Sequence, residues 1–321
     1  MQFNNVGSLV GGTGACAFTI AKCFPDMDRA IYTFGSPSRE LLEECKIEGV
    51  EVFSNKVSTE QAIDEFKPDF VILHNTNPGR IPEMDPRIPV IFYQHSNFSM
   101  ARASRDRSDV FFVCSRHLAR QAGVDEKFVL YQPVPLPPRK SVVRGSIPTI
   151  GRICTPKASK WKVEDFSEVY RHLSGRFPEV QFEFVGAPDS VRPVISGILG
   201  DRAVFHNPSW EQRWRLREWH GVLYSSSLEE SYGRVVCEAQ RAGCVPIVSR
   251  LGGFVEQINP GVTGALCASP EEYGDAVQML LDEKYDLGKM KEAGDFRGGA
   301  NQFRGRLIEV LKVLFDAKNG G

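Results

Sequence analysis

The most informative stretch of the sequence is LEESYGRVVCEAQRAGCVPIVSRLGGFVEQI, residues 228–258. A glycine turn at Gly233 leads into a helix-like run that ends at Gly243, and the short apolar run Val245–Val248 predicts a strand. A second turn, Gly252-Gly253, is followed by a second predicted helix. Strands, glycine turns and helix N-termini in this order build a sheet edge that binds anions. The stretch therefore predicts a phosphate-binding edge in an α/β protein.

Two glutamates, Glu230 and Glu238, flank the start of the first predicted helix. Eight residues of helix rise by about 12 Å, whereas the two carboxyl groups of a retaining glycosidase lie only about 5–5.5 Å apart. Two separate roles are therefore expected, with Glu230 on the hydroxyls of a sugar and Glu238 on a ribose. The alternative is an exposed Glu230 that complements the helix dipole and a second glutamate on the surface.

Outside this stretch, β-rich runs alternate with helix-like runs along the chain. In the first part, strands are predicted at Phe3–Val10, Ala30–Phe34, Val50–Phe53, Phe70–His74, Val90–Tyr93, Val110–Cys114 and Phe128–Tyr131, and helices near 14–23, 38–47, 58–66 and 115–122. This alternation predicts a parallel sheet with helices on both faces. Ligands of such sheets bind at the carboxyl ends of the strands.

The segment Gln132–Pro138, QPVPLPP, separates the two halves of the chain, because a proline-rich run cannot continue a helix or a central strand. In the second half, strands are predicted at Thr149–Gly151, Val180–Gly186, Ala203–Phe205, Gly221–Tyr224 and Gly264–Leu266, and helices at Val163–Phe177, Ser190–Leu199, Trp210–Glu218, near 270–283 and near 302–317. The expected fold class is α/β, with two such domains in tandem.

Composition excludes several classes of protein. The 321 residues leave room for two domains, and 39 basic against 40 acidic residues provide no bulk charge for binding nucleic acid. No run reaches the ~18 apolar residues of a transmembrane segment, and the N-terminus lacks the pattern of a signal peptide. The eight cysteines include no CxxC pair, which favours free thiols in a reducing cytoplasm.

The loop Gly11–Ala15 lies between a predicted strand and a predicted helix. Glycines there let the backbone approach a diphosphate, and the helix N-terminus favours its charge. Gly12 also begins a weak dinucleotide-binding pattern, but Thr33–Ser36 supplies no acidic residue for the ribose of NAD. Because an arginine can hold the 2′-phosphate of NADP, Arg39 keeps NADP as an alternative cofactor. The loop is thus predicted to face a phosphate, with a tight structural turn or a dinucleotide cofactor as alternatives.

Basic residues follow the first predicted strand of the second half. Arg152 ends this strand, and Lys157, Lys160 and Lys162 come shortly after it. A guanidinium and an ammonium group that converge from one strand end suit a pyrophosphate, although such a cluster is also common on a solvated surface. At the end of the next strand, a nucleotide base could lie against the backbone of Gly186-Ala187.

These residues carry a resemblance to a known family. Glu230–Glu238, followed by Ala242–Ser249 and Gly252–Glu256, resembles the donor-site signature of retaining glycosyltransferase family four. The match extends back through Arg152 and Gly186-Ala187 and covers most of residues 147–270. The resemblance implies the GT-B fold, in which two Rossmann-like domains face each other across a cleft. Residues 1–135 would form the acceptor domain, joined by the helix near 302–317, and residues 142–300 the donor domain.

The resemblance also implies roles for single residues. Arg152 and either Lys157 or Lys160 would hold the donor diphosphate, Glu230 would bind the transferred sugar, and His95 would face that sugar. The choice between the two lysines stays open, because the spacing from the arginine does not single one out.

Further donor contacts follow from the same resemblance. Glu238 would bind the ribose, Gly12 would approach the phosphates, and backbone near Gly186 and Ala187 would face the base. Main-chain amides at the helix start would complete the site, from Tyr232, Gly233, Arg234 and Val235.

The implied reaction passes a sugar from a nucleoside diphosphate to an acceptor hydroxyl with retention of configuration and without a metal or other cofactor. The one Asp-x-Asp triplet, Asp26-Met27-Asp28, falls in a predicted turn, and the six histidines are scattered. An arginine group could attract a phosphorylated acceptor or form a solvated helix face: Arg80, Arg102, Arg105 and Arg107.

Three other functions use the same features. A non-catalytic nucleotide-sugar-binding protein would need the same donor residues, and a sugar-nucleotide epimerase would share the fold. An NADP-dependent oxidoreductase would rest on the Gly12 loop. The base, the sugar and the acceptor hydroxyl are not specified by any pattern in the sequence.

Overall fold

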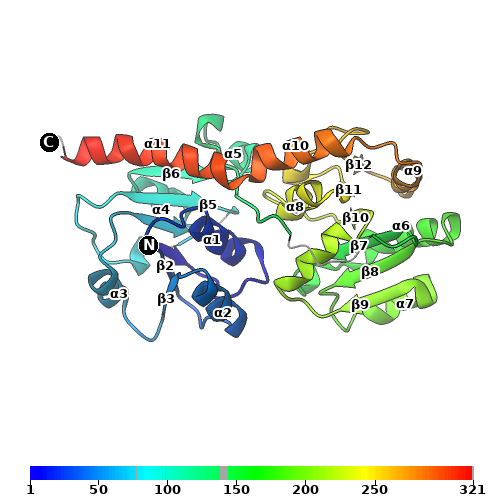
Figure 1. The fold of residues 1–321 in the computed structure, drawn as a ribbon, viewed down its shortest axis with the longest axis horizontal. Helices are drawn as coiled ribbons and strands as arrows, with labels where there is room; N and C mark the ends of the chain where they lie inside the picture. Colours follow the sequence, from blue (N-terminus) through cyan, green and yellow to red (C-terminus); the bar gives the residue numbers. More distant parts are fainter. Residues whose placement is uncertain (77, 98, 138–143, 320–321) are drawn as a thin grey trace. The chain divides into compact units, whose positions relative to one another are not determined.

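The computed structural model describes residues 1–76, 78–97, 99–137 and 144–319 (Figure 1). The chain divides into two compact units: unit 1 comprises Met1–Val134 and Gly298–Gly321, and unit 2 comprises Pro135–Arg297. The C-terminal helix α11 (Ala300–Asn319) therefore belongs to unit 1. Of the proline-rich segment, Pro138 lies outside the described residues.

Unit 1 contains one sheet of six parallel strands in the order β3-β2-β1-β4-β5-β6. The strands are β1 (Gln2–Asn4), β2 (Ala30–Thr33), β3 (Glu51–Ser54), β4 (Val71–His74), β5 (Val90–Gln94) and β6 (Val110–Val113). This is the Rossmann order, and the direction of winding reverses between β1 and β4. The carboxyl ends of these two strands therefore mark the expected ligand edge of unit 1.

Two helices of unit 1 start at serine residues that cap them. Ser38 accepts a hydrogen bond from the backbone of Leu41, and Ser58 forms a capping box with Gln61, contacts that each contribute about 1 kcal/mol. The helical segments of unit 1 before α11 are α1 (Gly12–Lys22), α2 (Arg39–Ile47), α3 (Thr59–Phe66), η1 (Pro78–Arg80), α4 (Ala101–Asp106), α5 (Arg116–Ala122) and η2 (Glu126–Phe128). Phe3, Tyr32 and Phe92 lie in the core that these helices cover.

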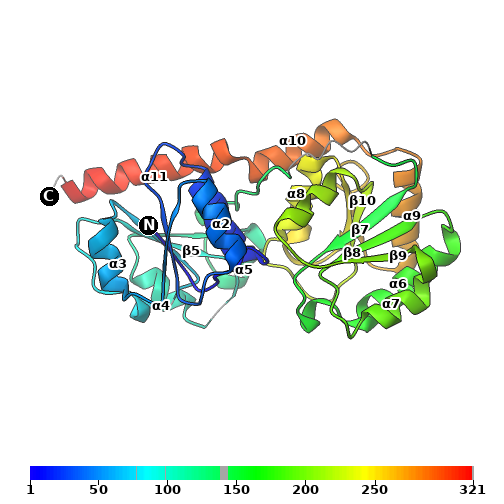
Figure 2. The ribbon, with the colours of Figure 1, turned by 60° about the horizontal axis from the view of Figure 1, so that its bottom comes forward.

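Unit 2 repeats this topology, with six parallel strands in the order β12-β11-β10-β7-β8-β9 (Figure 1). Figure 2 shows β7, β8, β9 and β10 of this sheet from another side. Its strands are β7 (Thr149–Ile153), β8 (Gln181–Val185), β9 (Ala203–His206), β10 (Gly221–Tyr224), β11 (Val245–Ser249) and β12 (Ala265–Cys267). The winding reverses between β7 and β10, so the ends of these strands form the expected ligand edge of unit 2.

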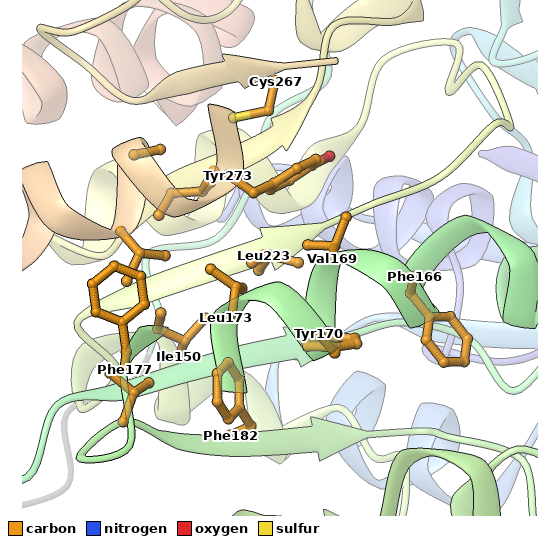
Figure 3. Packing of buried hydrophobic residues seen from close by; sticks show 14 of the residues in the cluster. Ile150, Phe166, Val169, Tyr170, Leu173, Phe177, Phe182, Leu223, Cys267 and Tyr273 are labelled. Carbon is orange, nitrogen blue, oxygen red and sulfur yellow. The ribbon is translucent and has the colours of Figure 1, made fainter. Parts of the chain in front are cut away.

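Two hydrophobic clusters cover the two faces of this sheet. One packs under α6, α7 and α9, where the rings of Tyr170 and Phe182 meet edge to face at 5.6 Å (Figure 3). The other packs under α8 and η5 around Trp219 and Phe254. The helical segments of unit 2 are η3 (Ala158–Lys160), α6 (Val163–Arg176), α7 (Arg192–Leu199), η4 (Gly200–Arg202), η5 (Glu211–Arg217), α8 (Arg234–Ala242), η6 (Gly252–Phe254), α9 (Pro270–Leu281) and α10 (Leu287–Gly298).

The expected α/β class is confirmed, but several predicted elements are wrong. The first strand ends at Asn4 instead of Val10, because the Asn4 side chain accepts a hydrogen bond from the backbone of Val6 and turns the chain. No strand forms at Phe128–Tyr131, where η2 leaves one isolated bridge to β6. The apolar residues there pack against β6 without a ladder, so their pattern resembles that of a strand.

Two helical predictions also need correction, and two helices were missed. The segment 210–218 forms a 3-10 helix, and the predicted second helix after Gly252-Gly253 is a single 3-10 turn. Helices α4 and α10 were not predicted, since α4 has only six residues and α10 has almost no apolar stripe. All eight cysteines are free thiols. Among the described residues, none of the helices is both long and apolar enough to cross a membrane.

Candidate active site

The predicted donor residues gather at the carboxyl edge of the sheet of unit 2. Arg152 lies on β7, Lys160 ends η3, and Glu230 lies in the loop between β10 and α8. The winding reverses between β7 and β10. The segment η3 follows β7, and the loop that contains Glu230 follows β10. The topology thus brings together residues that are 70 positions apart in the sequence.

Arg152 is the most deeply buried charged residue of this edge, with 1% of its surface exposed. Its guanidinium carbon lies 4.5 Å from the ring centre of Trp161 and 5.4 Å from that of Tyr224. The guanidinium donates hydrogen bonds to the backbone carbonyls of Lys160 (2.6 Å) and Ser225 (3.4 Å). Among the described residues, no carboxylate pairs with it and its Nε has no hydrogen-bond partner. Arg152 is therefore a buried cation that braces the backbone beside Lys160.

Lys160 forms a short ion pair with Glu230, and both side chains are 26% exposed. Burial lowers the pKa of Lys160, but the adjacent Glu230 carboxylate outweighs burial and raises this pKa above its ordinary value. Lys160 is therefore charged. Lys157, the competing lysine, is exposed at the surface, and Lys162 reaches the hydroxyl of Ser227 at 3.4 Å. Of the three lysines, the structure places Lys160 against Glu230.

Glycines at the start of α8 and in the Gly252-Gly253 turn lie very close to other residues. Gly233 has a φ of 82°, and a Cβ atom there would lie 2.3 Å from the ring of Phe254. Gly253 donates a backbone hydrogen bond of 2.7 Å to the carbonyl of Glu230, and a Cβ on Gly253 would lie 2.6 Å from Ser231. The Gly252-Gly253 turn thus holds the backbone of Glu230 in place.

A mutation at Gly233 is expected to destabilise the protein more than the matched change at Gly243. Both glycines flank α8 with left-handed backbone, at φ 82° and 79°, but only Gly233 has a neighbour within 4 Å. Gly243→Ala should cost about 1–2 kcal/mol of unfolding free energy for its backbone conformation. Gly233→Ala should cost about 1–3 kcal/mol more, because its Cβ overlaps Phe254. Urea unfolding of both variants measures the difference, and equal costs would contradict the tight packing.

Glu238 is buried inside α8, not exposed as its alternative interpretation supposed. Its side chain pairs with Arg234 one turn earlier, with 3.6 Å between Nη2 and Oε1. Both residues are less than 10% exposed. Buried carboxylates are normally paired, and Arg234 meets this requirement for Glu238. Val235 follows Arg234 in the first turn, whose N-terminus favours negative charge.

The end of β8 is also constrained by its glycine. Gly186 has a φ of 83°, and a Cβ atom there would lie 2.1 Å from the carbonyl oxygen of Cys154. The buried Ala187 has its carbonyl engaged by Nε of Arg192 at 3.0 Å. A base at this edge would therefore meet the remaining backbone atoms of the turn, not the Ala187 carbonyl.

In unit 1, the glycine loop connects β1 to α1 at the corresponding sheet edge. Gly11 needs to be glycine because its φ is 145°, and Gly14 because a Cβ would lie 2.1 Å from the carbonyl of Ser8. Gly12 is exposed as the first residue of α1, and nothing lies within 4 Å of its Cβ position. Backbone conformation therefore explains Gly11 and packing explains Gly14, while Gly12 leaves open space at a helix N-terminus.

His95 follows β5 in unit 1 and is almost fully buried. Its Nε2 lies 2.7 Å from Nδ1 of His74, and its Nδ1 lies 2.5 Å from Nε2 of Gln132. Both ring nitrogens therefore have protein partners. Sequence reasoning missed His74 and Gln132, although His74 ends a strand at the predicted ligand edge, as His95 does.

Burial lowers the pKa of His74 to about 3, and the sign of the resulting pH dependence follows. Below the ordinary histidine pKa of about 6.5 the unfolded chain takes up a proton that folded His74 refuses. The free energy of unfolding should therefore fall by up to about 1.4 kcal/mol per pH unit between about pH 6.5 and pH 3. His74→Asn should remove this share of the slope in denaturation curves. An unchanged slope in His74→Asn would contradict a neutral His74.

Other predicted features lie apart from this edge or are already occupied. Asp26 pairs with Arg304 at 2.5 Å, and Arg105 donates to Gln94 at 2.9 Å. Within the described residues, no group of three or more His, Cys, Asp or Glu side chains could hold a metal ion. A cavity of about 610 Å³ lies between α1, α11 and the starts of β1, β2 and β4. It opens at the amino ends of the strands, away from the ligand edge.

Comparison with known proteins places these observations in a family context. The family Glycosyl transferases group 1 matches residues 144–283. D-inositol 3-phosphate glycosyltransferase 2 of Catenulispora acidiphila is 24% identical over 241 residues, 71% of this chain and 49% of that protein. The corresponding enzyme of Mycobacterium sp. (strain KMS) is 26% identical over 207 residues, 61% of this chain and 38% of that protein. The chain thus spans about half or less of the length of these relatives.

Solved structures resemble the chain over nearly its whole length. Anabaena Alr3699/HepE in complex with UDP-glucose has a TM-score of 0.76 at 17% identity and covers 97% of this chain and 98% of its own. A glycosyltransferase from Rickettsia africae has a TM-score of 0.75 at 14% identity, with 98% and 97% covered. Sucrose-phosphate synthase from Thermosynechococcus elongatus has a TM-score of 0.67 at 15% identity, with 98% of each chain covered. The fold is GT-B.

Within this GT-B fold, the family match spans the predicted donor residues of unit 2, from Arg152 to Glu256. Gly12 and His95 lie outside the matched residues, in unit 1. The comparisons therefore bear on the fold of the whole chain and on the family of unit 2.

Proposed function

We propose that this protein is a retaining, metal-independent glycosyltransferase of family four that moves a sugar from a nucleoside-diphosphate sugar to an acceptor hydroxyl. The observation that carries this proposal is the meeting of Lys160 and Glu230 beside the buried Arg152, at the ligand edge of unit 2 and next to the N-terminus of α8. One cation for a diphosphate and one carboxylate for sugar hydroxyls are the two groups that such a donor requires.

Lys160, not Lys157, is the proposed diphosphate ligand. Its ammonium group lies at the ligand edge, while its backbone carbonyl is held by Arg152 at 2.6 Å. Arg152 thereby fixes the direction of the lysine and adds a buried positive charge that no carboxylate of the described residues neutralises. Such preorganised charge stabilises developing negative charge more strongly than the same groups would in water.

The ion pair between Lys160 and Glu230 predicts that both residues exchange partners when a donor binds. Lys160 and Glu230 now neutralise each other, so a donor must separate them. The diphosphate would replace Glu230 as the partner of Lys160, and a sugar hydroxyl would replace Lys160 as the partner of Glu230. A nucleoside diphosphate without sugar offers only the first replacement and would leave Glu230 without its cation.

In the proposed reaction, the bond between the anomeric carbon and the diphosphate oxygen breaks, and its electron pair stays on the diphosphate. Arg152, Lys160 and the first amides of α8 around Gly233 stabilise this leaving group. The acceptor hydroxyl attacks the same face of the sugar, and its proton passes to the departing diphosphate oxygen. No enzymic nucleophile is needed, which agrees with the separate roles of Glu230 and the buried Glu238.

A thermal-shift panel of UDP-, GDP-, ADP- and dTDP-sugars tests this function, with UDP-glucose first because the Anabaena structure contains it. A ligand present at 100 times its dissociation constant stabilises the folded state by about 2.7 kcal/mol. The expected result is stabilisation by one nucleotide class, followed by sugar transfer to an acceptor.

Three results would point elsewhere. Stabilisation by nicotinamide nucleotides alone would favour the oxidoreductase alternative. Release of nucleoside diphosphate in the absence of any acceptor would favour an epimerase. Donor binding without turnover across acceptor classes would favour a binding protein.

A further inference from the structure

Four side chains of unit 1 form a continuous buried hydrogen-bond chain, which we call the His95 chain: Gln2, His74, His95 and Gln132. All four residues are at most 6% exposed. The His95 chain crosses three neighbouring strands: Gln2 lies on β1, His74 at the end of β4, and His95 directly after β5. Its last member, Gln132, lies in the segment that follows η2.

One end of the chain fixes the direction of its hydrogen bonds. Nε2 of Gln2 lies 3.0 Å from the backbone carbonyl of Ala17, an atom that can only accept a hydrogen bond. The amide nitrogen of Gln2 must therefore face Ala17, and its Oε1 faces Nε2 of His74 at 2.8 Å. Because an amide oxygen also only accepts, Nε2 of His74 must carry a proton.

The same logic passes through the two rings. Burial lowers the pKa of His74 to about 3, so this ring is neutral and its Nδ1 is an acceptor. The 2.7 Å contact with His95 then requires a proton on Nε2 of His95. In the orientation that the Gln132 amide has in the structure, Nδ1 of His95 faces its Nε2, which is a donor. Every hydrogen bond is thus satisfied when both rings are neutral and protonated on Nε2.

The side chains of Tyr93 and Cys114 lie against His95. The ring of Tyr93 lies 4.4 Å from that of His95, and the thiol of Cys114 donates to the His95 carbonyl at 3.5 Å. Nε2 of His95 is directed at His74, which Gln2 connects to the Ala17 carbonyl, and Nδ1 at the Gln132 amide. A protonated imidazole would require the Gln132 amide to turn and present its oxygen to Nδ1.

We propose that the other members of the His95 chain are positioning residues that hold His95 in a single neutral tautomer, with its proton on Nε2. His95 thereby meets its ligand as a fixed, uncharged group and transfers no proton in the reaction. This role rests on the proposed function only where it concerns the reaction; the tautomer is a property of the ligand-free protein.

Nuclear magnetic resonance of protein labelled with ¹⁵N-histidine tests the tautomer directly. The expected result is a protonated Nε2 and an unprotonated Nδ1 for His95, both above and below the ordinary histidine pKa of about 6.5. A proton on Nδ1, or protonation of both nitrogens near that pH, would overturn the proposal. The wild-type spectrum decides this point without any variant or substrate.

Gln132→Glu is the matched perturbation, because a carboxylate of the same shape accepts hydrogen bonds and cannot donate one. The variant should place a second proton on His95 at neutral pH and add an ionisation to the pH profile of sugar transfer. Gln302→Glu, an exposed position on α11, adds the same charge and should change neither readout. Gln132→Leu should leave Nδ1 of His95 without its donor and permit the other tautomer.

The outcomes separate this inference from the proposed function. Failure of every nucleotide sugar to bind would reject the function while the tautomer stands. A wild-type pH profile with an ionisation that disappears in His95→Asn would reject the inference while sugar transfer stands.

Discussion

Replacing Arg152 by methionine should lower turnover about 10²–10³-fold while changing the free energy of unfolding by less than about 2 kcal/mol. The kinetic loss follows from the removal of the preorganised charge beside Lys160. The small change in stability follows from burial, because Arg152 is a cation without a carboxylate partner among the described residues. Relief of its desolvation cost offsets the lost hydrogen bonds to the carbonyls of Lys160 and Ser225.

Arg213→Met supplies the control for this experiment. Arg213 is also buried in unit 2 and lies against the ring of Trp210, but it belongs to η5. Its replacement should alter stability and leave turnover close to that of the wild type. Steady-state kinetics and urea unfolding of both variants provide the comparison. Wild-type turnover in a folded Arg152→Met protein would remove Arg152 from the proposed mechanism.

Replacing Glu230 by glutamine should have opposite effects on donor and on free nucleoside diphosphate. A hydrogen bond to a charged group contributes about 1.5–3 kcal/mol, so the loss at the sugar predicts a fall in kcat/KM of about 10- to 100-fold. The free diphosphate should bind more tightly, because Lys160 no longer has to leave a carboxylate partner. The variant would therefore lose much of its preference for the sugar-bearing nucleotide.

Isothermal titration with the nucleoside diphosphate and the matching nucleotide sugar measures both effects. Glu229→Gln is the matched control, since it removes one negative charge from the adjacent, exposed position and should change neither affinity in this selective way. Equal weakening of both ligands by Glu230→Gln would show that the Lys160 ion pair supports the structure of the loop and does not exchange with the donor.

Much of the fold could be predicted because it depends on local patterns. Parallel strands buried on both faces are short apolar runs, and helices with one buried face show a regular apolar spacing. These signals identified eleven of the twelve strands to within a few residues of their observed ends. The exception is the first strand, whose predicted end lies six residues beyond the observed one. The failures occurred where local signals mislead, as at Phe128–Tyr131, whose apolar residues pack against β6 without entering the sheet.

The glycine positions of the site could be recognised for a similar reason. Left-handed backbone at Gly186 and Gly233 and the close approach of Gly253 to Ser231 are requirements of single residues that no other residue type meets well. What each glycine approaches could not be deduced. The turn at Gly252-Gly253 was predicted to begin a helix, whereas it braces the backbone behind Glu230.

The sequence by itself thus determined the alternation of strands and helices, and it predicted which residues would form a phosphate-binding edge. Only the tertiary structure decided that Lys160 and not Lys157 meets Glu230, that Glu238 is buried against Arg234, and that the ring nitrogens of His95 are both engaged. Propensity and periodicity act over a few neighbouring residues. Side-chain contacts depend on strand order, which places residues together that are tens of positions apart in the chain.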